Sequence, residues 1–165
     1  MTNNIKLQEV CKQLHIPVVG TTSWPLPREA REILRESNPC PFTAADLEER
    51  LIGTSEFMPR SAIVCLFPYH VAHEGPTNLS RYTWATDYHL VVTDYLQRLV
   101  NELKSNTPDA LFSIHCDTSP LADRYMAYLA GLGFYGKNKC FINPTWGSYI
   151  VIGTVLTTLE FEPNT

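Results

Sequence analysis

Residues 114–160 read IHCDTSPLADRYMAYLAGLGFYGKNKCFINPTWGSYIVIGTVLTTLE, and this stretch carries most of the information about the fold. The apolar run from residue 111 to 116 predicts a strand that ends at Asp117. A helix is expected directly after it, because Thr118 or Ser119 can cap it and a proline suits its first turn. Glycines then end the helix, and a Gly-Lys-Asn loop leads into Val/Ile-rich strand sequence.

Asp117 has two interpretations at this position. A carboxylate at a strand end, beside a helix start and a glycine-punctuated loop, is placed where α/β proteins tend to keep their chemistry. From the pattern alone, an Asp before Thr-Ser-Pro is more typical of a residue that only caps the helix. Asp117 is therefore the candidate catalytic residue, with helix capping as the alternative.

The composition predicts one domain spanning residues 1–165. A chain of 165 residues with 44% hydrophobic residues can bury one core. No apolar run approaches the roughly 18 residues of a membrane span, and the N-terminus lacks the features of a signal peptide. We therefore expect a cytoplasmic protein without a membrane partner.

Charge and cysteine usage exclude several classes of protein. The net charge is −4 and there is no Lys/Arg run, so the chain by itself is expected to bind RNA or DNA poorly. The five cysteines are widely spaced without a CxxC pair, which argues against a zinc ribbon or a local iron–sulfur motif.

Hydrophobic periodicity predicts an alternation of helices and strands. The expected helices are 5–14, 28–36, 44–51 and about 83–104, and the expected strands are 15–20, 61–67, 111–116 and 148–160. A bend or bulge is expected near Gly153 in the last strand. These elements predict an α/β (α+β) fold with a mixed β-sheet flanked by helices.

Three motifs match known binding patterns in part, but their context does not support a binding site. His70 and His73 invite a metal interpretation, but no third ligand is placed by spacing, and no metal site is predicted. The glycines at 131, 133 and 136 match GxGxxG, yet they follow a helix and precede a strand, which is the wrong order for a nucleotide site. Asp87 and His89 match the beginning of a loop motif in which a histidine coordinates the cobalt of cobalamin, but the residues around them have a helical pattern. We expect Asp87 to favour the helix N-terminus and His89 to face solvent.

Aromatic residues gather near these loops and fit the wall of a pocket for a large planar ligand. They are Tyr82, Trp84, Tyr88, Phe134, Tyr135 and Trp146.

Four blocks, in order, closely resemble the N-terminal domain of epoxyqueuosine reductase and related iron–sulfur cluster-binding proteins. They are RYTWATDYH at 81–89, DTSPLADR at 117–124, GLGFYGKN at 131–138 and NPTWGSY at 143–149. Weaker similarity extends back through residues 49–50 and 61–69.

The resemblance implies a cobalamin-binding domain on a scaffold related to flavin nitroreductases. Its activity would be that of an oxidoreductase that removes an epoxide oxygen during queuosine synthesis in tRNA. Asp117 would be the proton donor, and a positioned carboxylic acid suits that task. The cofactor-binding residues implied are Arg50, Tyr88, His89, Arg124, Lys137 and Asn138. For Arg124, an exposed helix residue paired with neighbouring acids is the alternative.

The chain also departs from the family pattern. The resemblance places a 4Fe-4S (ferredoxin-like) module just after Pro163 and a helical-repeat region that contacts tRNA beyond it, and we expect this chain to lack both. Thr154 stands where relatives have Glu, and Thr86 where they have a basic residue, which leaves open a paralogue with another substrate. We expect an isolated or degenerate cobalamin domain, unable to turn over alone, that meets tRNA only through the missing regions.

Two other functions remain open. One is a cobalamin carrier or processing protein without redox turnover. The other is a flavin-binding, nitroreductase-like protein, although no basic cluster for the flavin phosphate is evident in the sequence. The oligomeric state is not predicted.

Overall fold

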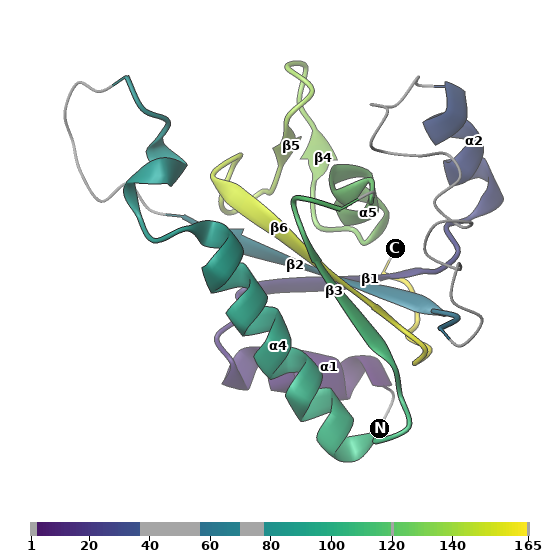
Figure 1. Ribbon diagram of the computed structural model, residues 1–165. Helices are drawn as coiled ribbons and strands as arrows, with labels where there is room; N and C mark the ends of the chain where they lie inside the picture. Colours follow the sequence, from purple (N-terminus) through teal and green to yellow (C-terminus); the bar gives the residue numbers. More distant parts are fainter. Residues whose placement is uncertain (1–2, 37–56, 70–77, 120, 165) are drawn as a thin grey trace.

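The computed structural model describes residues 3–36, 57–69, 78–119 and 121–164. Figure 1 shows a twisted sheet with helices on both sides. Its elements are α1 (Asn3–Gln13), β1 (Val18–Ser23), α2 (Arg28–Glu36), β2 (Ser61–Pro68), η1 (Arg81–Trp84), α4 (Tyr88–Asn106), β3 (Phe112–Cys116), α5 (Asp123–Leu129), β4 (Phe134–Tyr135), β5 (Phe141–Ile142) and β6 (Ile150–Thr157). The helix predicted at 44–51 and the histidines at 70 and 73 lie outside the described residues.

The main sheet has the order β1-β2-β6-β3, and β4 pairs with β5 in a separate hairpin. Each described neighbouring pair of strands is antiparallel, so the predicted mixed sheet is wrong and the fold is α+β. The α4 connection leads from β2 to β3, but these two parallel strands are separated by β6. Because each of them pairs with β6 instead, no parallel ladder forms between them.

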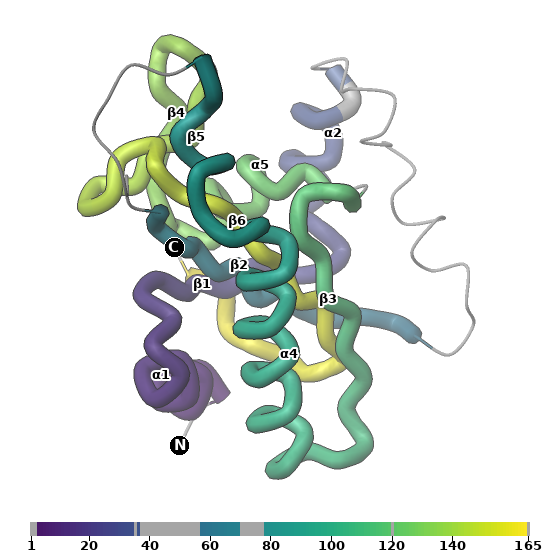
Figure 2. Tube along the Cα trace, turned by 60° about the vertical axis from the view of Figure 1, so that its left-hand side comes forward, coloured from purple at the N-terminus to yellow at the C-terminus, as the bar shows by residue number. Residues whose placement is uncertain are grey.

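One face of the sheet carries an apolar core beneath α1 and α4. Both helices lie on this side in two views (Figures 1 and 2). Alternate strand residues meet the buried stripe of α4, as the period of two in a strand requires. Its buried members include Leu7, Ile63, Phe67, Val92, Leu96, Leu99, Val155 and Phe161.

Gly153 lies under α4 in the middle of this face. It pairs with Cys65 on one side and Cys116 on the other, so the ladder runs through it and the predicted bulge is wrong. A Cβ at this position would come within 2.7 Å of Val92 and 2.9 Å of Leu96. The glycine therefore allows α4 to approach the sheet closely.

The opposite face is covered by α5, α2 and the β4–β5 hairpin (Figure 1). The predicted bounds of α2 are confirmed. The long helix begins later than predicted, at Tyr88, after the short 3-10 turn η1. The helix after Asp117 also begins later, at Asp123, and its N-cap residue Ala122 makes no side-chain capping bond. None of the described helices is long and apolar enough to cross a membrane.

Candidate active site

Asp117 follows β3 directly and has a left-handed backbone, with φ of 57°. The amide of Thr118 donates to the carbonyl of Cys116 at 2.8 Å, which closes a tight turn around it. Asp is among the few non-glycine residues that adopt this conformation, at a cost of about 1–2 kcal/mol. Backbone strain of this kind concentrates at functional sites.

Because of this turn, the Asp117 carboxylate lies on the opposite side of the sheet from the one that regular strand alternation predicts. Ser113 and His115 face α5, because His115 lies opposite Thr154, whose hydroxyl donates to Asp123 of α5 at 3.3 Å. A regular strand would place residue 117 on that face as well. The side chain of Asp117 instead contacts the first turn of α4.

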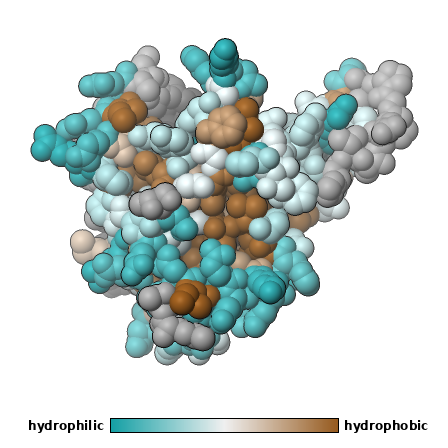
Figure 3. All heavy atoms as spheres, turned by 180° about the vertical axis from the view of Figure 1, so that it is seen from behind, coloured by the Kyte–Doolittle hydropathy of each residue, from teal (hydrophilic) through white to brown (hydrophobic). Residues whose placement is uncertain are grey.

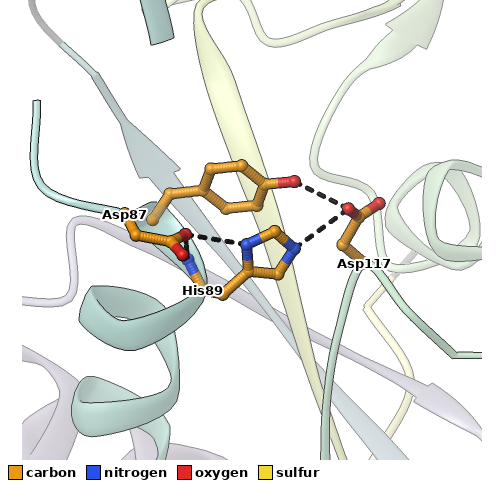
Figure 4. Close-up of polar contacts among 4 residues, drawn as sticks. Asp87, His89 and Asp117 are labelled. Carbon is orange, nitrogen blue, oxygen red and sulfur yellow. Dashed lines mark hydrogen bonds and ion pairs between the residues drawn. The ribbon is translucent and has the colours of Figure 1, made fainter. Parts of the chain in front are cut away.

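Two donors from that turn meet Asp117 (Figure 4). The Tyr88 hydroxyl donates to Asp117 Oδ2 at 2.6 Å, and His89 Nε2 lies 3.1 Å from the same oxygen. The carboxylate thus takes part in a side-chain cluster, and no described contact makes it a helix cap. Its side chain is 58% exposed, which leaves room for a ligand to reach it.

Asp87 holds His89 from the other side. It is the N-cap of α4, as predicted, since its carboxylate accepts from the His89 amide at 3.0 Å. The same oxygen lies 2.8 Å from His89 Nδ1. The His89 side chain is 39% exposed, so it faces solvent in part as expected, but both of its ring nitrogens also meet carboxylates and its ring stacks on Tyr88 at 4.0 Å.

Tyr88 and His89 both have raised pKa values, but for different reasons. The hydrogen bond to Asp87, helped by the one to Asp117, raises the pKa of His89. Burial, followed by the hydrogen bond to Asp117, raises the pKa of Tyr88 well above its usual range. Tyr88 thus keeps its proton and donates it to the hydrogen bond, whereas His89 holds its proton to a higher pH than an ordinary histidine does.

A second carboxylate lies close by. Asp123 begins α5 and is largely buried, and this burial raises its pKa to about 7, with a further contribution from the charge of Asp117. The Cys116 thiol between them is half-buried, which raises its pKa to about 11 and keeps it protonated. Sequence reasoning missed Asp123, although an acid one turn before an apolar helix stretch is a readable signal.

The other predicted site residues are not brought to Asp117 by any described contact. Arg124 donates to the Lys139 carbonyl at 3.1 Å, joining α5 to the hairpin turn. Lys137 and Asn138 are exposed in that turn, where Asn138 accepts from a backbone amide. Arg50 lies outside the described residues.

Aromatic side chains surround the start of α4, as the sequence suggested for some of them. Tyr82 packs edge-on against Tyr88 at 5.7 Å, and Tyr149 packs edge-on against Tyr69 at 5.6 Å. Arg81 lies 5.9 Å from the centre of the Tyr149 ring. Phe134 and Tyr135 belong to the hairpin instead. Within the described ranges, no three His, Cys, Asp or Glu side chains are arranged to hold a metal ion.

The cluster brings two carboxylates, a tyrosine and a histidine together on an α+β scaffold, and comparisons with known proteins show what the chain is similar to. A family model described as "Epoxyqueuosine reductase QueG, DUF1730" matches residues 55–118, which include Asp87, Tyr88, His89 and Asp117. The epoxyqueuosine reductase of Gloeobacter violaceus is 35% identical over 123 residues, covering 72% of this chain and 37% of that protein. That of Bacillus cereus is 40% identical over 84 residues, covering 51% of this chain and 22% of that protein.

Solved structures agree over nearly the whole chain. Epoxyqueuosine reductase from Streptococcus thermophilus matches with a TM-score of 0.81 and 26% identity, over 100% of this chain and 48% of that one. An epoxyqueuosine reductase solved with an epoxyqueuosine-modified stem loop of tyrosine tRNA matches with a TM-score of 0.79 and 26% identity, over 98% and 47%. A reductive dehalogenase described in terms of B12-dependent dehalogenation shares the fold alone, at 14% identity and a TM-score of 0.53 over 96% of this chain and 20% of that one.

The resemblance predicted from the sequence is therefore confirmed: the chain is a homologue of the epoxyqueuosine reductases. It spans less than half the length of the relatives described above. The relation to flavin nitroreductases stays a prediction.

Proposed function

We propose that this chain is the cobalamin-binding, catalytic domain of an oxidoreductase that removes the epoxide oxygen of epoxyqueuosine in tRNA, with Asp117 as its proton donor. The observation that carries the proposal is the Asp117 carboxylate, turned out of β3 and held by Tyr88 and His89 at 2.6 and 3.1 Å. Homology to epoxyqueuosine reductases supports the reaction, and the shared fold of the B12-dependent dehalogenase supports the cofactor.

The cluster is suited to deliver a proton to a departing oxygen. Removal of an epoxide oxygen creates an alkoxide-like charge, which a positioned carboxylic acid can neutralise. His89 Nε2 lies 3.1 Å from Asp117 Oδ2, and Asp87 stabilises the charged imidazole when Nε2 holds a proton. In this arrangement Asp117 donates to the substrate, His89 replaces the lost proton, and Tyr88 keeps the carboxylate aimed.

The residues around Asp117 fit a large flat ligand with polar edges. Exposed tyrosine rings at 82 and 149 supply apolar area, and the Arg81 guanidinium and the tyrosine hydroxyls supply donors. When bound, cobalamin would supply the reducing chemistry at the substrate carbon. His89 would line the ligand rather than coordinate its metal, because both ring nitrogens are engaged by carboxylates. Contacts from Arg50, Arg124, Lys137 and Asn138 complete the proposal.

The remaining parts of the activity would come from outside this domain. Electrons are proposed to arrive from 4Fe-4S clusters of the kind that the sequence resemblance implies. The tRNA substrate and a cytoplasmic location are proposed on the same homology, supported by the relative that was solved with a tRNA stem loop.

Cofactor binding is tested first, by adding cob(II)alamin to the purified chain and following the visible spectrum and the heat of binding. Micromolar or tighter binding is expected for the wild type and for Asp117→Asn. Absence of binding at micromolar concentration would overturn the proposal, and a yellow protein as purified would point to a flavin instead.

Catalysis is tested with cobalamin reduced chemically by titanium(III) citrate, so that no cluster module is needed, and with epoxyqueuosine as substrate. Asp117→Asn should lose at least about a hundredfold in rate, the size of a general-acid contribution. Asp109→Asn, an exposed carboxylate at the far end of α4, is the matched control and should react as the wild type. Tight binding with no dependence on Asp117 would identify a cobalamin carrier.

A further inference from the structure

The segment formed by α5 and the β4–β5 hairpin, residues 121–142, has a local charge opposite to that of the chain. Its cations are Arg124, Lys137 and Lys139, and its only acid is Asp123. All three cations are exposed, whereas Asp123 is turned toward Thr154 under α5. The surface of this segment is therefore positive although the chain as a whole carries −4.

Three tyrosine rings of the same segment pack in a row. Tyr125 stacks on Tyr128 at 6.0 Å with an interplanar angle of 20°, and Tyr128 lies 6.1 Å from Tyr135. Tyr128 is 47% exposed and Tyr135 42%, whereas Phe134, the preceding residue of β4, belongs to the other face of the hairpin. A row of half-exposed rings on one short helix and one hairpin is more aromatic area than a solvated surface needs.

The surface is held rigidly. Tyr135 packs edge-on against the buried Phe141 at 6.3 Å, and Arg124 bonds to the Lys139 carbonyl at 3.1 Å. A Cβ at Gly133 would collide with the Ile142 carbonyl, so the two hairpin strands approach as closely as only glycine permits. The hairpin projects from the sheet beside α5 (Figure 1), and in the space-filling view from behind its tip stands out as a hydrophilic projection at the top (Figure 3).

We propose that this surface, the exposed rings of Tyr128 and Tyr135 together with Lys139, binds unpaired bases of RNA. Aromatic faces stack on bases that a loop exposes but a duplex hides, and lysines neutralise the phosphates beside them. The inference deepens the proposed function, on which it rests for the identity of the RNA. It replaces the expectation from net charge alone, since RNA responds to the local charge it meets.

The position of the surface fits a substrate loop that reaches the site. Asp123, the residue before Arg124, lies close enough to Asp117 for the two charges to interact. An RNA loop stacked on Tyr128 and Tyr135 therefore lies next to the element that begins beside the catalytic cluster. The chain would in this way contribute its own contact with tRNA.

The test measures binding of an unmodified stem-loop RNA of tyrosine tRNA to the whole 165-residue chain by fluorescence anisotropy at low salt. Tyr128→Leu and Tyr135→Leu keep the apolar bulk but remove the hydroxyl and the flat ring, and each should weaken binding about fivefold or more. Lys139→Asn should lower the salt dependence by about one ion, and asparagine suits the φ of 62° at this position. Lys12→Gln, on α1 at the opposite face, is the control and should bind as the wild type.

A fully paired RNA duplex of the same stem should bind several-fold more weakly than the stem loop. Equal binding of duplex and loop, or wild-type binding by both tyrosine variants, would overturn the inference. Circular dichroism confirms that each variant is folded.

The same variants separate this inference from the proposed function. If Tyr128→Leu weakens cob(II)alamin binding and leaves RNA binding intact, the surface belongs to the cofactor and the inference falls alone. If RNA binding depends on the tyrosines while cobalamin fails to bind, the proposed function falls and the surface stands.

Discussion

The two faces of the sheet are built differently. The face under α1 and α4 has an apolar centre, with Leu96 and Leu99 fully buried against alternate residues of β2 and β6. Its buried polar residues, Thr21, Ser61 and Thr157, carry no ionisable group. The face under α5 buries Thr154 and places Asp123 and His115 beside it. Polar groups at low dielectric cost stability but acquire shifted pKa values, so the first face stabilises the fold and the second can tune protons.

The Asp117 turn links these two faces. Strand alternation would place the Asp117 side chain on the α5 face. Its left-handed backbone instead brings the carboxylate into contact with α4. The proposed proton donor thus rests on the rigid helix of the apolar face while it remains electrostatically close to the carboxylate of the other face.

Truncation of the apolar face should have the largest effect on stability. Leu96→Ala removes a fully buried side chain and should lower the free energy of unfolding by about 2–5 kcal/mol. Chemical denaturation measures this change. Leu90→Ala, on the same helix but 68% exposed, is the control and should stay within about 0.5 kcal/mol of the wild type. Similar losses at both positions would contradict the assignment of the stabilising face.

The α5 face should make the stability of the protein depend on pH. The pKa of Asp123 is raised from 3.8 to about 7 in the folded protein. The contribution of the protonated carboxyl to the free energy of unfolding is therefore fully present below pH 3.8 and is lost as pH rises through about 7. Asp123→Asn should remove this loss and stabilise the protein above pH 7 by up to about 4 kcal/mol.

The measurement is the free energy of unfolding across that pH range. Asp109→Asn is again a suitable control, because this exposed residue lies away from the α5 face. Parallel pH profiles for wild type and Asp123→Asn would show that the buried carboxyl does not titrate as the structure indicates.

The contact between α4 and the sheet can be probed without removing any side chain. Gly153→Ala adds a methyl group within 3 Å of the Val92 and Leu96 side chains, and the forced repacking should cost about 1–3 kcal/mol. Thermal unfolding checks this value. A second substitution, Leu96→Ala in the Gly153→Ala background, should recover part of the loss, and strictly additive effects would argue against direct contact.

The smallest effects are expected in the titration of two histidines. Asp87 and Asp117 raise the pKa of His89 above 6.5, whereas burial lowers that of His115 below it. Folding therefore gains from protonated His89 at low pH and loses this gain as pH rises through the raised pKa. NMR of the ring protons should show the two transitions on opposite sides of 6.5, and Asp87→Asn should move only that of His89 downward.

Local elements were predictable from the sequence because their signals are local. The periodicity of 28–36 and the apolar run from Ser61 gave α2 and β2 nearly to the residue. The direction of strand pairing was not predictable, because β6 comes last in the chain yet inserts between β2 and β3. Pairing between segments that are distant in sequence leaves no pattern within either of them.

The candidate site was predictable in part. Asp117 was found from its place at a strand end, and Tyr88 and His89 from resemblance to a family. Their meeting was not foreseen, because it depends on the positive φ of Asp117, which carries no distinct signal in a residue common in caps and turns. For the same reason the later start of α5 was missed.

The backbone at Asp117 narrows what mutation can do at this position. A residue with φ of 57° is filled at low cost only by Gly, Asn or Asp, so alanine or a branched side chain would harm the fold as well as the chemistry. A lineage that lost the proposed reaction but kept the fold is accordingly expected to carry asparagine or glycine at this position. The residue at this position in homologous sequences would then distinguish proteins that keep the proposed proton donor from proteins that have lost it.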